Sequence, residues 1–314
     1  PPVPWDDAAA ARFRHAVILA DPGFGKTWLL KHEAIRLARQ AAGQLRACSH
    51  GVETIIVPIY VRLSELARSD DELEQALTRH VLGRVSAAQK RRVERETTGD
   101  DPSPRPLHRS PTPAPGLAPE LAAHLASQLA QGRCAVLIDA WDEVPPEPVG
   151  EGGVIRGLPG YRQRQGERLK DFAAGFTGPL RLTSRLVGYG SGLLPDAQEL
   201  ELIALESPQV VAFAGVWFPD NERRQAFLSL LREQPPVHGL SRIPLMLTLL
   251  CRAFQQEGSL PDRRVDLYEK CLRGLLRDWL LLDKRADGQD LRLGDSYVEA
   301  MLELLAGTEH ALHT

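Results

Sequence analysis

Apolar strand-like runs alternate with amphipathic helical segments over the first two thirds of the chain. Short β-branched apolar runs are typical of buried strands, whereas apolar residues spaced three and four apart predict helices. We expect strands at 17–20, 54–63, 134–144 and 179–185, and helices at 27–42, 71–82, 118–132 and 167–176. Strands that alternate with helices indicate an α/β fold, in which a parallel sheet has helices on both faces.

Local signals refine two of these elements. Pro58 lies inside the second predicted strand, and proline has no N–H to give to a neighbouring strand, so we expect an edge strand or a bulge there. Ser69 and Asp70 precede the helix at 71–82 and are residue types that cap helix N-termini.

From Glu206 onward the pattern is helical throughout. Ser207 and Pro208 predict an N-cap and a first-turn proline for a helix that runs through Phe218. Further helices are expected at 222–232, 244–256 and 264–281. The pattern therefore indicates an α/β part of the chain that is followed by an all-helical part.

A proline-rich stretch interrupts the α/β pattern. Seven prolines lie between Gly99 and Pro119, among almost no large apolar residues. Such a composition cannot bury enough apolar surface to form a packed core. We expect residues 83–119 to be a disordered or loosely extended insertion.

Charge, hydropathy and cysteine spacing indicate which kinds of ligand and environment the protein has. The 38 Lys and Arg residues nearly balance 41 Asp and Glu residues, so we expect no direct nucleic-acid binding. No apolar run approaches the roughly 18 residues that a membrane span needs. Cys48, Cys134, Cys251 and Cys271 lie far apart, without zinc-ligand spacing, which favours reduced thiols in a cytoplasmic protein.

The segment AVILADPGFGKTWLL, residues 16–30, places a lysine at the expected start of a helix. A cation in the first turn opposes the helix dipole by roughly 0.3 to 1 kcal/mol unless an anion lies between them. The phosphate-binding P-loop has this arrangement, with the pattern G-x-x-x-x-G-K-[ST] between a strand and a helix. The chain matches it at Gly25, Lys26 and Thr27, whereas Ala20 replaces the first glycine.

The replaced glycine is the one that the loop needs least. Ala20 ends a strand, where a negative φ suffices, while Gly23 and Gly25 lie where backbone N–H groups converge on phosphate. We expect Lys26 to bridge the β- and γ-phosphates and the hydroxyl of Thr27 to bind Mg²⁺. The alternative is an ordinary glycine turn between a strand and a helix.

Acidic residues lie in the carboxyl-terminal part of the third predicted strand. Four apolar residues lead to Asp139 at the carboxyl end of the strand, where ligands of open α/β sheets bind. We expect Asp139 to hold Mg²⁺ through water, and Asp142 and Glu143 to orient a water onto the γ-phosphate. Without a P-loop, the same residues would be read as a solvated acidic loop.

The strand at 179–185 ends in Thr183, Ser184 and Arg185 at the same sheet edge. A guanidinium there can detect whether a γ-phosphate is present, because its planar donors match phosphate oxygens. We expect Arg185 to be this sensor. The alternative is a surface arginine that merely follows a strand.

Four segments resemble the successive motifs of NACHT ATPases, members of the STAND class of signalling P-loop NTPases. They are LADPGFGKTWLL, VLIDAWDEV, LRLTSR and IPLMLTLLCRAFQQEGSLPDRRVDLYEKCL, and the resemblance extends from about Arg14 to Leu281. Its most specific part is the Walker B form, which residues 139–143 match as Asp, Ala, Trp, Asp and Glu.

The resemblance implies a P-loop nucleotide-binding domain at 1–203, a helical domain at 204–260 and the beginning of a winged-helix domain at 261–314. It places Pro244 near the adenine base. With the residues above, the expected catalytic set is Glu143, Asp142 and Arg185, and the expected metal set is Thr27 and Asp139. The expected nucleotide-binding residues are Ala20, Asp21, Pro22, Gly23, Phe24, Gly25, Lys26, Thr27, Trp28 and Pro244.

The resemblance also implies a function. ADP would hold a closed state, and ATP would favour an open, self-associating state of a slow cytoplasmic ATPase that uses Mg²⁺. Family members act in innate immunity and in bacterial defence against phage, with effector and sensor domains that we expect outside this chain. A nucleotide-clamped scaffold with little turnover and another kind of P-loop ATPase are the alternatives. The absence of an N-K-x-D element and an LSGGQ-type signature disfavours a GTPase or a transporter ATPase.

Overall fold

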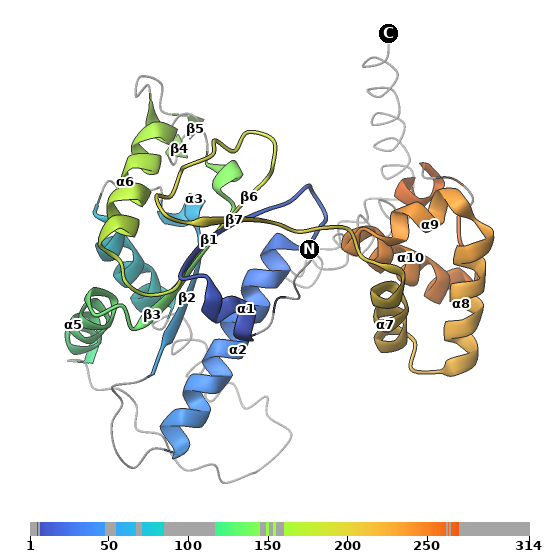
Figure 1. Ribbon diagram of the computed structural model, residues 1–314, viewed down its shortest axis with the longest axis horizontal. Coiled ribbons are helices and arrows are strands. Elements are labelled where there is room, and N and C mark those ends of the chain that lie inside the picture. Colours follow the sequence, from blue (N-terminus) through green and yellow to red (C-terminus); the bar gives the residue numbers. More distant parts are fainter. Residues whose placement is uncertain are drawn as a thin grey trace, which may run out of the picture. The chain divides into compact units, whose positions relative to one another are not determined.

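The computed structural model describes residues 5, 7–47, 55–66, 71–84, 117–144, 149–150, 153–154, 160–261, 263 and 265–269 (Figure 1). The chain divides into two compact units between Ile203 and Ala204. The described part of the first unit is α/β, and that of the second is helical. Most of the predicted insertion at 83–119, most of the expected winged-helix segment at 261–314, and the predicted caps Ser69 and Asp70 lie outside the described residues.

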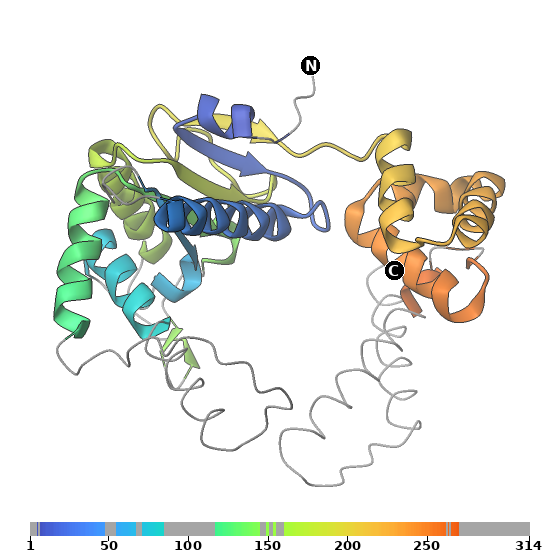
Figure 2. The same ribbon diagram turned by 90° about the horizontal axis from the view of Figure 1, so that it is seen from below.

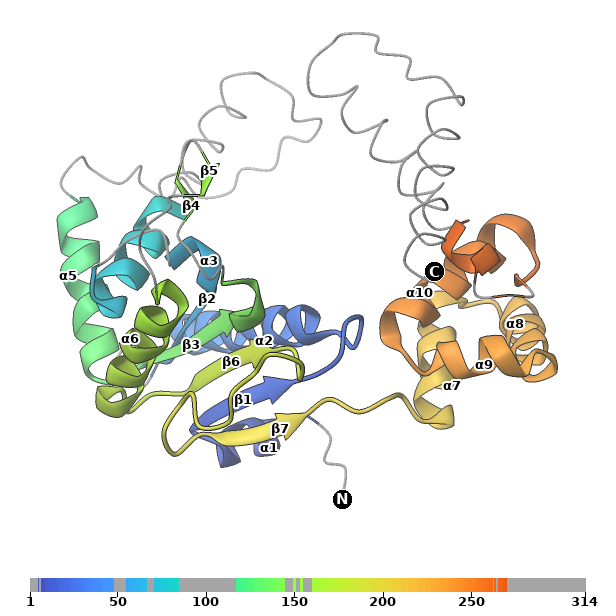
Figure 3. The same cartoon turned by 90° about the horizontal axis from the view of Figure 1, so that it is seen from above.

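The first unit is built on a five-stranded sheet in which all strand pairs are parallel, as the sequence predicts. The strand order is β2-β3-β6-β1-β7, which Figure 3 shows from one side. Pro58 lies in the edge strand β2, which confirms the first of its two predicted placements. The strands are β1 (His15–Leu19), β2 (Val57–Arg62), β3 (Cys134–Asp139), β6 (Leu180–Ser184) and β7 (Gln198–Glu201).

In the sequence, helices lie before, between and after these strands. A further helix covers residues 73–84, and a short antiparallel pair, β4 (Val149–Gly150) and β5 (Gly153–Val154), precedes α6. The other elements are α1 (Asp7–Arg12), α2 (Lys26–Ala47), α3 (Leu63–Leu66), α5 (Leu117–Ala130), the 3-10 turn η2 (Trp141–Glu143) and α6 (Tyr161–Gly175).

Helices cover both faces of the sheet. Successive side chains of a strand point to opposite faces, so each buried strand offers apolar residues to helices on either side. On one face, Ile18 of β1 and Leu137 of β3 pack against Leu30 of α2, which runs along the sheet in Figure 2. On the other face, Val17 and its neighbours pack against the helix at 73–84, α5 and α6.

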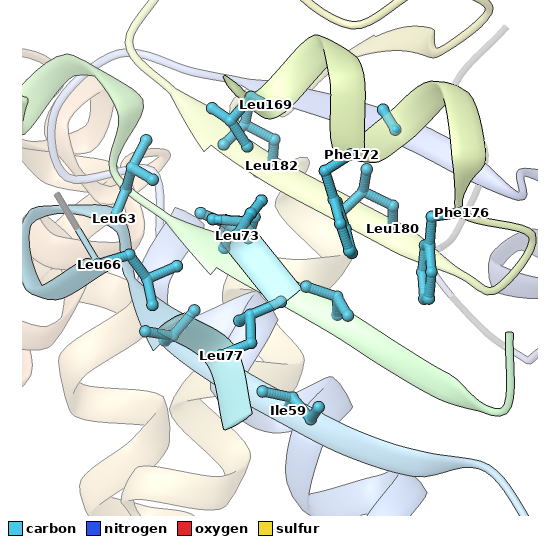
Figure 4. Packing of buried hydrophobic residues seen from close by; sticks show 14 of the residues in the cluster. Ile59, Leu63, Leu66, Leu73, Leu77, Leu169, Phe172, Phe176, Leu180 and Leu182 are labelled. Carbon is cyan, nitrogen blue, oxygen red and sulfur yellow. The ribbon is translucent and has the colours of Figure 1, made fainter. Parts of the chain in front are cut away.

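The larger of the two clusters joins elements that are far apart in sequence. Figure 4 shows Leu73 and Leu77 on the same side of the strands as Leu169 and Phe172 of α6. The rings of Phe172 and Phe176 stack with their centroids 4.8 Å apart. Full burial of each large apolar side chain is worth roughly 1.5 to 3 kcal/mol, so this cluster holds the helices on the sheet.

The structure corrects several predicted boundaries. The strand predicted at 134–144 ends at Asp139, because Ala140 takes a left-handed conformation with φ 67° and a 3-10 turn follows. Helix α6 begins at Tyr161, six residues before its predicted start. Strand β7 was not predicted, because the sequence QELE lacks the apolar residues that mark buried strands.

The second unit contains α7 (Ser207–Trp217), α8 (Asn221–Glu233), α9 (Pro235–Ser241) and α10 (Pro244–Glu257) among its described residues. Its core includes an aromatic group of Phe218, Phe227 and Phe254, with ring centroids 5.2 to 5.6 Å apart. The predicted N-cap Ser207 was wrong by one residue. Glu206 caps α7 through a reciprocal capping box with Gln209, because its longer carboxylate can reach the N–H three residues ahead.

Candidate functional site

Three strand ends lie together at the carboxyl edge of the sheet. The connection after β1 leads to α2 on one face, whereas the loop after β6 buries Leu194 on the other face. Adjacent parallel strands whose connections leave to opposite faces create a crevice at their carboxyl ends, where ligands of such sheets bind. Because β6 lies between β1 and β3, this edge brings together the loop after β1, Asp139 and Arg185.

The loop after β1 has the backbone that its glycines predict. Gly23 has φ 84° and Gly25 has φ 91°, values that glycine adopts without a steric penalty. A Cβ added to Gly25 would meet no protein atom within 4 Å, so the space beside it is open. Ala20 is buried and donates its N–H to the carbonyl of Ser184 at 3.2 Å, which extends the pairing of β1 with β6.

Lys26 is the first residue of α2, and the first turn of that helix contains no acidic side chain. Its Nζ donates to the carbonyl oxygens of Ala20 at 2.7 Å and Asp21 at 3.2 Å, which uses two of its three donors. Burial lowers the pKa of Lys26 below its usual 10.5, and the negative charge of Asp142 opposes this shift. The helix start is therefore positively charged and faces the acidic residues that follow β3.

Asp139 is buried at the end of β3 and is held by both neighbouring strands. Its Oδ1 accepts a 2.6 Å hydrogen bond from the hydroxyl of Thr183 on β6, and its Oδ2 accepts a 3.0 Å hydrogen bond from Tyr60 on β2. Thr183 in turn accepts the N–H of Ala140 at 2.9 Å. The carboxylate is thus fixed in one orientation, with two of its roughly four lone-pair sites in use.

Asp142 and Arg185 form a two-point contact at this edge. The backbone N–H of Arg185 donates to Oδ1 of Asp142 at 3.0 Å, and Nε of Arg185 lies 2.8 Å from Oδ2. The Arg185 side chain is 53% exposed, and exposed ion pairs contribute about 0–1 kcal/mol. The pair therefore positions the guanidinium more than it stabilises the fold.

Glu143 ends the 3-10 turn, and its side chain is exposed. Its negative charge contributes to raising the pKa of Arg62, whose larger cause is a hydrogen bond with Tyr60. Arg62 is the register partner of Asp139 in the pairing of β2 with β3, so Glu143 lies at the same edge as the other acidic residues.

The remaining predicted nucleotide-binding residues are placed as follows. Asp21 and Pro22 are exposed, whereas Phe24 and Thr27 are partly buried. Trp28 is 67% exposed and stacks on His32 of the next turn, with the ring centroids 4.9 Å apart. Pro244 is the first residue of α10 and belongs to the second unit.

The sequence alone does not identify the hydrogen-bond partners of Asp139. Tyr60 lies 79 residues from Asp139 in the chain and Thr183 lies 44 residues away, so both contacts depend on the order and register of the strands. The signal available in the sequence was the hydroxyl group that Tyr60 and Thr183 each place within a largely apolar strand. The position of Arg62 beside Asp139 also depends on strand register, so the sequence alone does not identify it either.

The oxygen ligands at this edge are too few to hold a metal ion alone and fit a cation that also binds phosphate oxygens. Among the described residues, no group of three or more His, Cys, Asp or Glu side chains is arranged to hold a metal ion alone. Mg²⁺ is usually bound by one or two carboxylates together with waters and phosphate oxygens. Asp139 supplies a carboxylate and Thr27 a hydroxyl, which are oxygen ligands of the kind that this mode uses.

No protein-family model and no curated protein matches the chain. In the described part of the chain, every helix is too short or too polar to cross a membrane.

Proposed function

We propose that the chain is the nucleotide-binding module of a NACHT-type signalling ATPase, which acts as a nucleotide-dependent oligomerisation switch in innate immune or anti-phage defence. The observation that supports this proposal is the convergence of a glycine loop, Lys26 and the fixed carboxylate of Asp139 at one edge of a parallel sheet. The proposal also rests on the resemblance of four sequence segments to the motifs of that family.

In this function the loop after β1 and the first turn of α2 bind the phosphates of ATP or ADP. The first four N–H groups of a helix have no partner within it, and they point toward an anion at its N-terminus. Lys26 adds a positive charge, and Thr27 adds a hydroxyl for the cation. Bound Mg²⁺ would neutralise charge on the transferring phosphoryl group.

Hydrolysis would use the acidic residues after β3. Glu143 is exposed at the sheet edge and can accept a proton from an attacking water, with Asp142 as a second carboxylate. Asp142 also holds Arg185, whose exposed guanidinium can contact a γ-phosphate oxygen. In this scheme Arg185 reports which nucleotide is bound.

The test of nucleotide binding is the identity of the nucleotide released when the purified protein is denatured. We expect ADP or ATP from the parent protein and none from Lys26→Ala, with Lys170→Ala as control because Lys170 is an exposed lysine on α6. Bound nucleotide at a thousandfold excess over its Kd stabilises a protein by about 4 kcal/mol, so Lys26→Ala should also melt at a lower temperature. Release of GDP, or of no nucleotide, by the parent protein would refute the proposal.

The test of turnover is phosphate release by Asp142→Asn/Glu143→Gln. Loss of a general base typically costs about 10²–10⁴-fold in rate, while binding of ATP should change little. Glu167→Gln, an exposed carboxylate on α6, is the matched control. Sedimentation of the parent protein and the double variant with ATP measures self-association. ATP binding without turnover in the parent protein would favour a nucleotide-clamped scaffold.

A further inference from the structure

Tyr60 joins the exposed edge of the sheet to the buried carboxylate of Asp139. Its ring is partly buried against the cluster of Ile18, Leu30 and Leu137. Its hydroxyl donates to Oδ2 of Asp139 at 3.0 Å and has a second hydrogen bond with the side chain of Arg62.

The two donors to Asp139 come from opposite sides. Thr183 on β6 binds Oδ1 and Tyr60 on β2 binds Oδ2, and these strands are the two neighbours of β3 in the sheet. A carboxylate with one donor on each oxygen cannot rotate about its Cβ–Cγ bond without breaking one of them. Its remaining lone pairs therefore have fixed directions.

We infer that Tyr60 is a positioning residue that orients Asp139 toward the waters of a nucleotide-bound Mg²⁺. This inference rests on the proposed function, because the cation reaches the site together with nucleotide phosphates. Hydrogen-bond partners of metal-binding carboxylates tune metal affinity, and their loss typically costs about 10- to 100-fold. A purely structural hydroxyl would affect only the stability of the fold.

The experiment compares Tyr60→Phe with the parent protein by calorimetric titration with ADP, once with EDTA and once with saturating Mg²⁺. The measured quantity is the factor by which Mg²⁺ tightens ADP binding. We expect Tyr60→Phe to bind ADP as the parent does in EDTA, because the phenylalanine keeps the ring. With Mg²⁺, we expect the tightening factor to fall about 10- to 100-fold, or to vanish where the parent factor is smaller.

Tyr189→Phe is the matched control. Tyr189 also donates to a carboxylate, Oε1 of Glu199 at 3.1 Å, within the same compact unit. We expect this variant to keep the parent response to Mg²⁺. Thermal melts of both variants separate a general loss of stability from a specific loss of Mg²⁺ dependence.

A second comparison uses Asp139→Asn, which keeps the shape of the side chain but removes its charge. If Tyr60 acts through Asp139, Tyr60→Phe should have no further effect on the Mg²⁺ response in the Asp139→Asn background, whereas independent effects would add. Additive effects would overturn the inference.

The outcomes separate the inference from the proposed function. A parent protein that binds no nucleotide overturns both. A parent protein that binds ADP without any response to Mg²⁺ overturns the inference and leaves nucleotide binding intact. A parent protein with a clear Mg²⁺ response that Tyr60→Phe reproduces in full overturns the role of Tyr60 alone.

Discussion

Gly25→Ala tests whether the loop after β1 lies against a phosphate. Gly25 has φ 91°, a conformation that costs an L-residue roughly 1–2 kcal/mol. For a unit of this size, 1 kcal/mol lowers Tm by about 2–4 °C, so we expect a loss of roughly 2–8 °C without ligand. Beyond this local backbone strain, the added Cβ meets no protein atom within 4 Å outside its chain neighbours, so a further steric conflict would have to come from a bound molecule.

Gly192→Ala is the control for backbone strain. Gly192 has φ 78°, an added Cβ there also meets nothing within 4 Å, and its N–H to Glu199 is kept by alanine. We expect both variants to lose similar stability in thermal melts without nucleotide. In calorimetric titration with ADP, we expect only Gly25→Ala to lose affinity, by at least about tenfold, which corresponds to about 1.4 kcal/mol. Equal ADP affinity for Gly25→Ala and Gly192→Ala would refute the close approach of phosphate to this loop.

Three further predictions concern stability. An alanine Cβ at Gly178 would lie 2.5 Å from the backbone carbonyl oxygen of Cys134, which cannot move aside. We therefore expect Gly178→Ala to lower the free energy of unfolding, measured by urea denaturation, by about 1–3 kcal/mol. Gly43 lies on the open face of α2, where an added Cβ meets nothing within 4 Å, so Gly43→Ala should raise the free energy of unfolding by about 0.5–1 kcal/mol. Burial lowers the pKa of His15 and His80 below 6.5, so the unfolded chain takes up protons first as pH falls below about 6.5. We therefore expect the free energy of unfolding to decrease from pH 7 to pH 5, and His15→Gln to flatten that decrease. A free energy of unfolding that stays level or rises over this range would contradict the histidine argument.

Hydrophobic pattern and turn chemistry were sufficient to predict four of the five strands of the sheet. The apolar runs around Val17, Ile138 and Leu182 are buried strands, and Pro58 correctly indicated an edge. These signals are local, because burial of a strand requires apolar residues along its own length. Strand β7 could not be predicted in this way. It is an edge strand with mostly exposed side chains, so backbone hydrogen bonds, which almost any sequence can form, are enough to hold it.

The arrangement of the candidate site was only partly predictable, because its residues come from different strands. The sequence indicates that Asp139 and Arg185 each follow a strand, but it does not say that β6 lies between β1 and β3. That order decides which side chains become neighbours. It places Thr183 against Asp139, and it places Arg185 within reach of Asp142.

The contact between Arg185 and Asp142 shows what this dependence means for function. From the sequence alone, Arg185 is a free cation expected to contact a γ-phosphate, and Asp142 is a free carboxylate expected near the attacking water. In the structure the two side chains neutralise each other across 2.8 Å, and the charges of both act on Lys26. A γ-phosphate that drew the guanidinium of Arg185 away would free Oδ2 of Asp142, while Oδ1 would keep its hydrogen bond from the backbone N–H of Arg185. This ion pair, in which only the Arg185 side chain is largely exposed, would then couple recognition of the nucleotide to the availability of a second carboxylate oxygen.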